Sequence, residues 1–102
     1  MAKAKYAVGQ LMTHKLFNYR GVIIDVDPYF QGDNDWYELM ALSRPNKKAP
    51  WYYVLVHDAV HCTYVAEENI ILDESGEEIN HPDVTNHFSC FANGRYHIKH
   101  AN

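Results

Sequence analysis

The sequence predicts a mainly β fold, a small and partly open barrel with one short helical insertion. Short runs of β-branched and aromatic residues alternate with turn residues along the chain, as in small all-β proteins. The length of 102 residues suits one domain and is too short for two, so we expect a single domain over residues 1–102. Aromatic residues make up 14% of the chain and let a small core bury a large area.

The first half of the chain contains two expected strands. Residues 8–14 alternate apolar and polar side chains after Gly9, which is typical of a short strand. Residues 20–27 are dense in β-branched side chains and stop at Pro28, which cannot donate to a sheet ladder. Gly21, at the start of this second run, allows a bulge or a close approach of another backbone.

A long connection follows, over residues 29–48. Within it, Asp33 or Asn34 can cap a short helix over residues 36–42. The segment at 44–48 contains a proline and an asparagine, so we expect the helix to end before it.

The second half begins with the apolar run at 51–56, which predicts a further strand. A hairpin turn over residues 57–60 is expected to lead into a strand at 61–65. Residues 66–69 then predict a single helical turn, and residues 70–72 a short apolar strand.

Near the C-terminus, residues 88–91 and 96–98 are expected to pair around a turn at 92–95, because its Asn-Gly pair suits a hairpin. Strand alternation places Trp51 and Tyr53 on one face of their strand. Tyr52 is expected on the opposite face. The core is expected to include Val22, Ile24, Val54 and Val56.

Charge is distributed unevenly along the chain. The net charge of −4 excludes a uniformly basic nucleic-acid binder, although not a local basic face. Residues 1–51 hold seven bases and five acids, a balance of +2, whereas residues 52–102 hold two bases and eight acids, a balance of −6. The stretch 67–83 contains seven acids and no base, and it is either a solvated loop or a surface for a basic patch on a protein partner. The candidate residues of that surface are Glu67, Glu68, Asp73, Glu74, Glu77 and Glu78.

The first half offers the alternative of nucleic-acid binding. Its basic residues are interleaved with aromatic residues such as Tyr19, Trp36 and Trp51, and small barrels can bind strands by stacking beside a basic groove. The competing interpretation is that these aromatic side chains belong to the core. The candidate DNA contacts are Lys15, Arg20, Arg44, Lys47 and Lys48.

No complete catalytic or metal-binding set is visible. His57 and His61 are four residues apart, and His97 and His100 three apart, but neither pair supplies the three or four ligands that zinc needs. Asp25 and Asp27 share one strand face, yet the position of Asp27 before Pro28 is explained by turn chemistry. We therefore expect no enzyme activity, no metal and no cofactor.

The cysteines and the N-terminus predict the compartment. The two cysteines form no Cys-x-x-Cys motif, and a secreted scaffold of this size would usually carry more of them. No apolar run approaches the length of a membrane span, and the first residues lack the apolar region of a signal peptide. We expect a cytoplasmic protein with reduced thiols and no membrane partner.

Taken in order, several segments resemble the HspQ/YccV-like family, also called the hemimethylated-DNA-binding domain family. The matching segments are Gly9-Gln10, His14-Lys15, residues 19–23, 25–28, 49–56 and 64–70, His81-Pro82 and residues 88–96. The segment 57–62, with two histidines and a cysteine, departs from many members, so no role is carried over to it.

The resemblance implies an SH3-like barrel and a non-enzymatic bacterial stress (heat shock) protein. Members are associated with degradation of denatured proteins and with stimulation of a Lon-type ATP-dependent protease, and a similar domain is appended to a eukaryotic F-box protein. The expected partners are therefore such a protease and denatured client proteins, with hemimethylated DNA as the alternative partner. The negative net charge favours the protein partners. A homo-oligomer is left open, because a small barrel need not bury every aromatic side chain.

Overall fold

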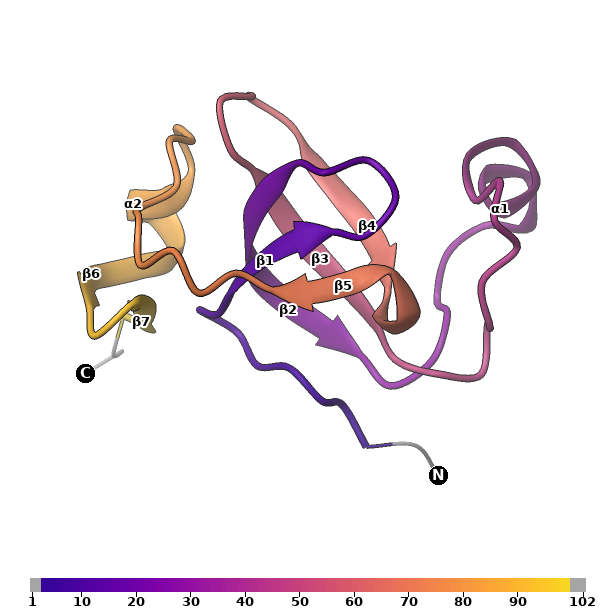
Figure 1. The fold of residues 1–102 in the computed structure, drawn as a ribbon. Coiled ribbons are helices and arrows are strands. Elements are labelled where there is room, and N and C mark those ends of the chain that lie inside the picture. Colours follow the sequence, from indigo (N-terminus) through magenta and orange to yellow (C-terminus); the bar gives the residue numbers. More distant parts are fainter. Residues whose placement is uncertain (1–2, 100–102) are drawn as a thin grey trace.

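Antiparallel strands build most of the molecule in the computed structural model, which describes residues 3–99 (Figure 1). Five of the strands form one sheet in the order β4-β3-β2-β1-β5. Its strands are β1 (Leu11–His14), β2 (Arg20–Asp27), β3 (Trp51–Val56), β4 (Cys62–Ala66) and β5 (Ile70–Leu72). A second sheet is the hairpin of β6 (Phe88–Ala92) and β7 (Arg95–Ile98). The expected mainly β, partly open barrel is confirmed.

Three short helices join the strands of the described residues: α1 (Asn34–Met40), the 3-10 helix η1 (Glu67–Asn69) and α2 (Val84–His87). The cap of α1 is Asp33, whose carboxylate accepts a 2.6 Å hydrogen bond from the Asp35 amide, as expected. The helix starts two residues earlier than residue 36, because the cap precedes it directly. The helical turn α2 was not expected.

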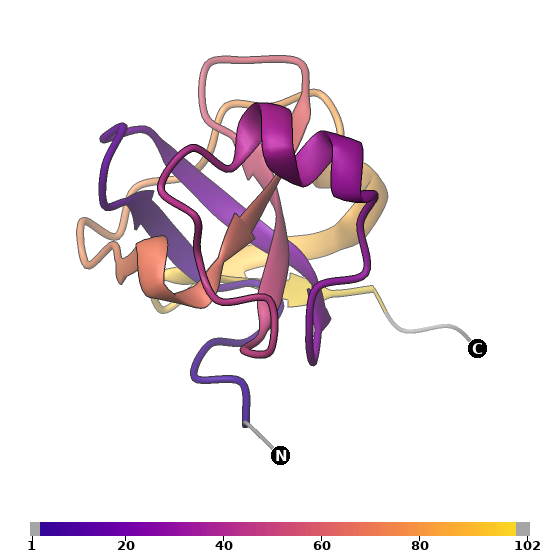
Figure 2. The same ribbon diagram turned by 90° about the vertical axis from the view of Figure 1, so that its right-hand side faces the viewer.

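The elements outside the five-stranded sheet lie in two groups at its opposite ends (Figure 1). The β6–β7 hairpin lies at one end with α2, and α1 lies at the other. Seen from the side of α1, the helix crosses in front of the strands (Figure 2). The described helices include none that is long and apolar enough to cross a membrane.

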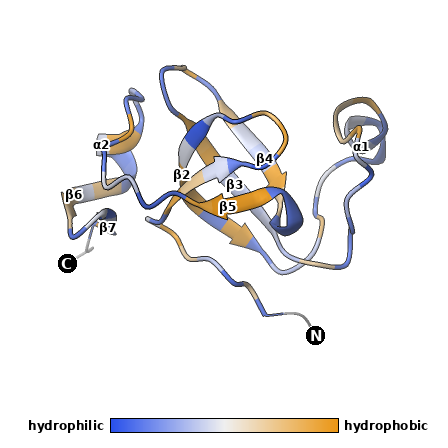
Figure 3. Ribbon diagram, viewed as in Figure 1, coloured by the Kyte–Doolittle hydropathy of each residue, from blue (hydrophilic) through white to orange (hydrophobic). Residues whose placement is uncertain are grey.

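The core consists of three clusters, and β3 contributes to all of them. Trp51 and Tyr52 are both fully buried, because additions cover both faces of this central strand. The ring of Tyr64 lies 5.1 Å from that of Trp51 and 4.5 Å from that of Tyr53, which confirms that these two residues share a face. Hydrophobic residues run along the whole of β5, at the edge of the sheet (Figure 3).

Of the expected core residues, Val22, Val54 and Val56 are buried. Ile24 is only half-buried and packs beside the first cluster. The pairing of β2 with β3 shifts register between Ile23 and Asp25, and this bulge leaves Ile24 without a partner. The prediction that Ile24 lies in the core is therefore correct only in part.

Gly9 explains why β1 is shorter than the expected strand at 8–14. Its φ of +95° lies in the left-handed region, which interrupts a strand. The Gly9 carbonyl accepts a 2.9 Å hydrogen bond from the Tyr96 amide, and a Cβ at Gly9 would lie 2.2 Å from the Tyr96 carbonyl oxygen. The glycine thus lets the C-terminal hairpin approach the barrel. In that hairpin, Asn93 and Gly94 both have positive φ, as an Asn-Gly turn requires.

Candidate binding site

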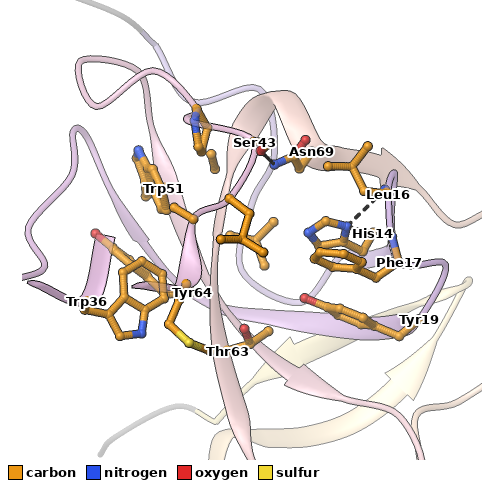
Figure 4. Close-up of a pocket in the computed structure, with 16 residues that line it drawn as sticks. His14, Leu16, Phe17, Tyr19, Trp36, Ser43, Trp51, Thr63, Tyr64 and Asn69 are labelled. Atoms are coloured by element: carbon orange, nitrogen blue, oxygen red, sulfur yellow. Dashed lines mark hydrogen bonds between the residues drawn. The ribbon is translucent and has the colours of Figure 1, made fainter. Parts of the chain in front are cut away.

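A small apolar pocket lies where α1, the β1–β2 turn and β4 meet, with a volume of about 140 Å³ (Figure 4). Residues of β1, α1, β3, β4, η1 and the adjoining loops contribute, and none of the contributing side chains is formally charged at neutral pH. The lining residues are His14, Leu16, Phe17, Tyr19, Trp36, Met40, Ala41, Leu42, Ser43, Pro45, Trp51, Thr63, Tyr64, Val65, Ala66 and Asn69.

The β1–β2 turn forms one wall. His14 is buried, and its Nδ1 accepts hydrogen bonds from the amides of Leu16 (3.1 Å) and Phe17 (3.2 Å), which fixes the turn. The imidazole also stacks on the Phe17 ring, with centroids 4.6 Å apart. Leu16 is nevertheless 50% and Phe17 65% exposed. The turn therefore presents two large apolar side chains that the core does not use.

Aromatic rings form the opposite wall. Trp51 is buried, whereas Trp36 and Tyr64 are half-buried and lie within 6.2 Å of it, centroid to centroid. The polar ends of the two deeper rings are bound elsewhere: Trp51 Nε1 donates to the carbonyl oxygen of Asn46 (3.0 Å), and the Tyr64 hydroxyl donates to the Asp27 carboxylate (2.6 Å). Their apolar faces remain free to line the pocket. Figure 4 shows His14, Phe17 and Tyr19 on one side of the pocket and Trp36, Trp51 and Tyr64 on the other.

The rim of the pocket is closed at one point and apolar elsewhere. Asn69 Nδ2 donates to Ser43 Oγ at 3.4 Å and links η1 to the segment after α1. Met40 is 62% and Leu42 73% exposed, so the end of α1 adds two more uncovered apolar side chains. These residues, with the β1–β2 turn, make an exposed apolar border around the pocket.

Burial in this region favours neutral side chains. It lowers the pKa of His14 below 6.5 and raises the pKa of Tyr19 above its ordinary value. Burial, reinforced by the hydrogen bond to Asp27, also raises the pKa of Tyr64. The pocket is therefore suited to uncharged groups.

Both arginines among the candidate basic residues are engaged within the fold. The Arg20 guanidinium is engaged by the Asp73 carboxylate, the Ser75 hydroxyl (3.0 Å) and the Glu77 carbonyl oxygen (2.6 Å). Arg44 donates to carbonyl oxygens at the end of α1 and pairs with Glu38 at 3.2 Å. Two of the five candidates thus hold parts of the fold together.

The three candidate lysines differ in their surroundings. The Lys47 ammonium lies 4.2 Å from the centre of the Tyr37 ring and donates to Asn34 Oδ1 at 2.9 Å. Lys15 and Lys48 are exposed, and within residues 3–99 neither makes an ion pair. Lys47 likewise makes no ion pair in the described part of the chain, so three of the five candidates keep an unpaired positive charge.

The six candidate acidic residues also include some that bind groups of the same chain and some that are exposed without an ion pair among residues 3–99. The Glu67 carboxylate accepts from the Tyr52 hydroxyl (2.5 Å), and that of Glu68 accepts from the Asn46 amide (2.7 Å). Burial alone would raise the pKa of Asp73, but hydrogen bonds from Ser75 and Arg20 outweigh it and hold the pKa below its usual value. Glu74, Glu77 and Glu78 remain exposed without an ion pair in the described part of the chain. These three are the accessible part of the acidic segment.

The histidines do not converge. His57 Nδ1 accepts from the Asn80 amide (2.8 Å), and buried His81 bonds the carbonyl oxygen of His61 (2.9 Å). Among residues 3–99, no three His, Cys, Asp or Glu side chains gather to hold a metal ion. The pair of His97 and His100 cannot be compared, since His100 lies outside the described residues.

Sequence reasoning did not anticipate this pocket. The strands predicted at 8–14 and 20–27 and the helix predicted over 36–42 assign no role to the large apolar residues between the strands or at the end of the helix. Leu16 and Phe17 in a five-residue connection between strands were the available signal, because turns are ordinarily polar.

Comparison with known proteins supplies the family. The family model described as "Hemimethylated DNA-binding protein YccV like" matches residues 4–95. F-box only protein 21 from Homo sapiens is similar to this chain, being 38% identical over 93 residues, which is 89% of this chain. F-box only protein 21 from Mus musculus and from Pongo abelii shows the same identity and coverage. The match covers 15% of the length of these curated relatives. The strand pattern, the resemblance of the motifs and the family model agree, and the chain belongs to the YccV-like family.

Proposed function

We propose that this protein is a non-enzymatic interaction module that promotes degradation of denatured proteins by assisting a Lon-type ATP-dependent protease in the cytoplasm. The observation that carries the proposal is the uncharged pocket with its exposed border of Leu16, Phe17, Met40 and Leu42. Contiguous exposed apolar side chains commonly mark a protein-interaction site. Denatured proteins expose apolar segments that such a site can bind.

The charged residues support a protein partner as well. Arg20 and Arg44 bind groups of their own chain, so neither guanidinium is free to contact phosphates. The accessible acids Glu74, Glu77 and Glu78 form a negative surface that can attract a basic patch. We infer that the pocket binds the denatured client and that the acidic segment contacts the protease.

The experiment is a degradation assay with a purified Lon-type protease, ATP and a denatured fluorescent client. The protein should accelerate degradation, Leu42→Glu should reduce the acceleration, and Val60→Glu should not. Val60 is 82% exposed on the β3–β4 turn and is absent from the pocket lining, so it is a matched control. Charge reversal at Glu74, Glu77 and Glu78 should also weaken the stimulation. No acceleration by the unaltered protein would refute the proposal.

Binding of hemimethylated DNA is the second candidate function, favoured by the description of the matching family model. Phosphate contacts would have to come mainly from Lys15, Lys47 and Lys48, and affinity would fall steeply with salt. Fluorescence anisotropy with hemimethylated and unmethylated duplexes of one sequence, at low and near-physiological salt, tests it. Salt-sensitive binding that prefers the hemimethylated duplex and weakens in Lys15→Gln and Lys48→Gln would establish this function.

A further inference from the structure

The strand that lines the pocket is an edge strand. β4 stands first in the sheet order and pairs only with β3 in the described sheet. The Val56 amide donates to the His61 carbonyl oxygen (3.4 Å) and the Glu67 amide to the Pro50 carbonyl oxygen (3.0 Å). These two bonds define which residues face β3, because hydrogen-bonded and non-hydrogen-bonded pairs alternate in an antiparallel ladder.

By this alternation, the backbone groups of Cys62 and Tyr64 point away from β3. Within residues 3–99, no amide or carbonyl of these two residues bonds a backbone group outside the ladder. Unpaired amides and carbonyls on a sheet edge are a template for another strand. The outer edge of β4 therefore offers hydrogen bonds at alternate residues.

The pocket runs along this same edge. Thr63, Tyr64, Val65 and Ala66 all line it. Because these four residues are consecutive along β4, the pocket follows the strand. The β1–β2 turn lies on one side of this space and the aromatic rings on the other, as Figure 4 shows. The site is a slot with an open strand edge between two apolar walls.

Size and charge indicate what fits the slot. A volume of about 140 Å³ is below the roughly 300–1,000 Å³ of pockets that enclose drug-sized ligands, but it accommodates individual side chains. The lining has no formally charged side chain, so the inserted residues must be uncharged. Lys15 stands in sequence between the lining residues His14 and Leu16 and has a free charge, which complements an acidic residue beside the inserted run.

We propose that an extended apolar segment of another protein adds to the outer edge of β4 as a further strand. Its backbone bonds the free groups of Cys62 and Tyr64, and its successive side chains alternate between the two walls. An acidic residue next to the apolar run pairs with Lys15. This inference rests on the proposed function and specifies which feature of a denatured client is recognised: a short apolar run in extended conformation.

Intrinsic fluorescence can report such binding directly. The chain has two tryptophans, and both Trp36 and Trp51 line the slot. The probe is a blocked eight-residue peptide without tryptophan, carrying a central Val-Ile-Val run followed by aspartate. We expect a saturable change in tryptophan emission. Leu42→Glu should weaken binding about tenfold or more, as at other interface anchors, and Val60→Glu should leave it unchanged.

Two further probes separate strand addition from simple apolar contact. Peptides N-methylated at odd or at even positions remove alternate backbone donors, so one set should lose binding and the other should retain it. Hydrogen exchange of the Tyr64 amide should slow when the unmodified peptide is bound. Replacing the peptide aspartate by lysine should weaken binding to the unaltered protein more than to Lys15→Gln.

Three outcomes would overturn the inference: no saturable binding, equal binding of both methylated peptides, or unchanged exchange at Tyr64. The degradation assay is read separately. If Leu42→Glu loses stimulation of the protease while the peptide never binds, the proposed function stands and strand addition is wrong. If the peptide binds at β4 but the protein does not stimulate degradation, the slot exists and the proposed function fails.

Discussion

The two ends of the five-stranded sheet are both rich in aromatic residues, yet only one end is closed. At the β6–β7 end, Phe88 and Tyr96 are 4% and 3% exposed and pack with Leu11 in one cluster. At the α1 end, Trp51 is buried, but Trp36 and Leu42 beside it keep contact with solvent.

The difference follows from how each addition is anchored. The hairpin is held by its backbone, through the hydrogen bond between Tyr96 and Gly9, and the Tyr96 hydroxyl accepts a 2.8 Å bond from the Ile79 amide. The segment around α1 is joined to the sheet through side chains, including the bond from Trp51 Nε1 to the Asn46 carbonyl oxygen and the bond from the Gln31 amide to the Tyr64 hydroxyl (3.1 Å). These bonds hold the segment at a few points and leave Trp36 and Leu42 in contact with solvent. Composition alone therefore does not separate core from binding surface.

The largest expected effect is at the closed end. Phe88→Ala removes a buried ring from the first cluster and should lower the free energy of unfolding by about 3–5 kcal/mol. Trp36→Ala at the open end should cost about half as much or less, because its ring is only half-buried. Urea unfolding of both variants measures the contrast. Equal losses would mean that the α1 end is as closed as the hairpin end.

The anchoring of the hairpin can be broken at one glycine. Gly9→Ala forces a side chain into the left-handed region and against the Tyr96 carbonyl oxygen, so a loss of about 3 kcal/mol is expected. Gly76→Ala shares a positive φ but has nothing within 4 Å of a new Cβ, and it should cost only about 1 kcal/mol. Thermal melts of the pair compare them. A Gly9→Ala protein as stable as Gly76→Ala would contradict the close approach.

His14, which lines the pocket at the open end, should make the free energy of unfolding fall in acid. Burial lowers the pKa of His14 in the folded state below the 6.5 of an unfolded chain. The unfolded state therefore binds more protons in this range, so stability is complete above pH 6.5 and falls as the pH drops below it. In His14→Asn the amide oxygen can accept the same turn amides without titrating. Unfolding free energies between pH 5 and 7.5 should fall less in the variant, and identical slopes would exclude His14 as the cause.

The smallest expected effect on stability is at the rim of the slot. Leu42→Glu and Val60→Glu replace exposed side chains, so each should change the free energy of unfolding by about 0.5 kcal/mol or less. The same urea experiment measures both. Because stability is unaffected, any loss of peptide binding in Leu42→Glu reports on the slot alone. A large loss of stability in Leu42→Glu would place this residue in the core.

Local chemistry explains why much of the fold was predictable. The β-branched run of β2, the apolar run of β3 and the Asn-Gly turn before β7 each specify a conformation through their own backbone preferences and side-chain pattern. The same is true of the Asp33 cap of α1. These elements needed no information from distant parts of the chain.

Two features could not be predicted without knowledge of distant parts of the chain: the bulge beside Ile24, and the interruption at Gly9 that makes β1 begin only at Leu11. Both depend on which strand or hairpin lies opposite, a relation between residues far apart in the sequence. Ion pairs between residues far apart in the sequence also depend on the tertiary structure. Nothing in the neighbourhood of Arg20 in the sequence indicates that it would bind Asp73, 53 residues away.

By itself, then, the sequence determined the class of fold, the family, the positions of the strands and the negative net charge, because each follows from composition, short-range pattern or motif order. The tertiary structure alone decided which charges remain free and which aromatic rings remain uncovered. It also placed Leu16, Phe17 and Leu42 around the open edge of β4. A binding slot is made of side chains from several elements, and only folding brings their surfaces together.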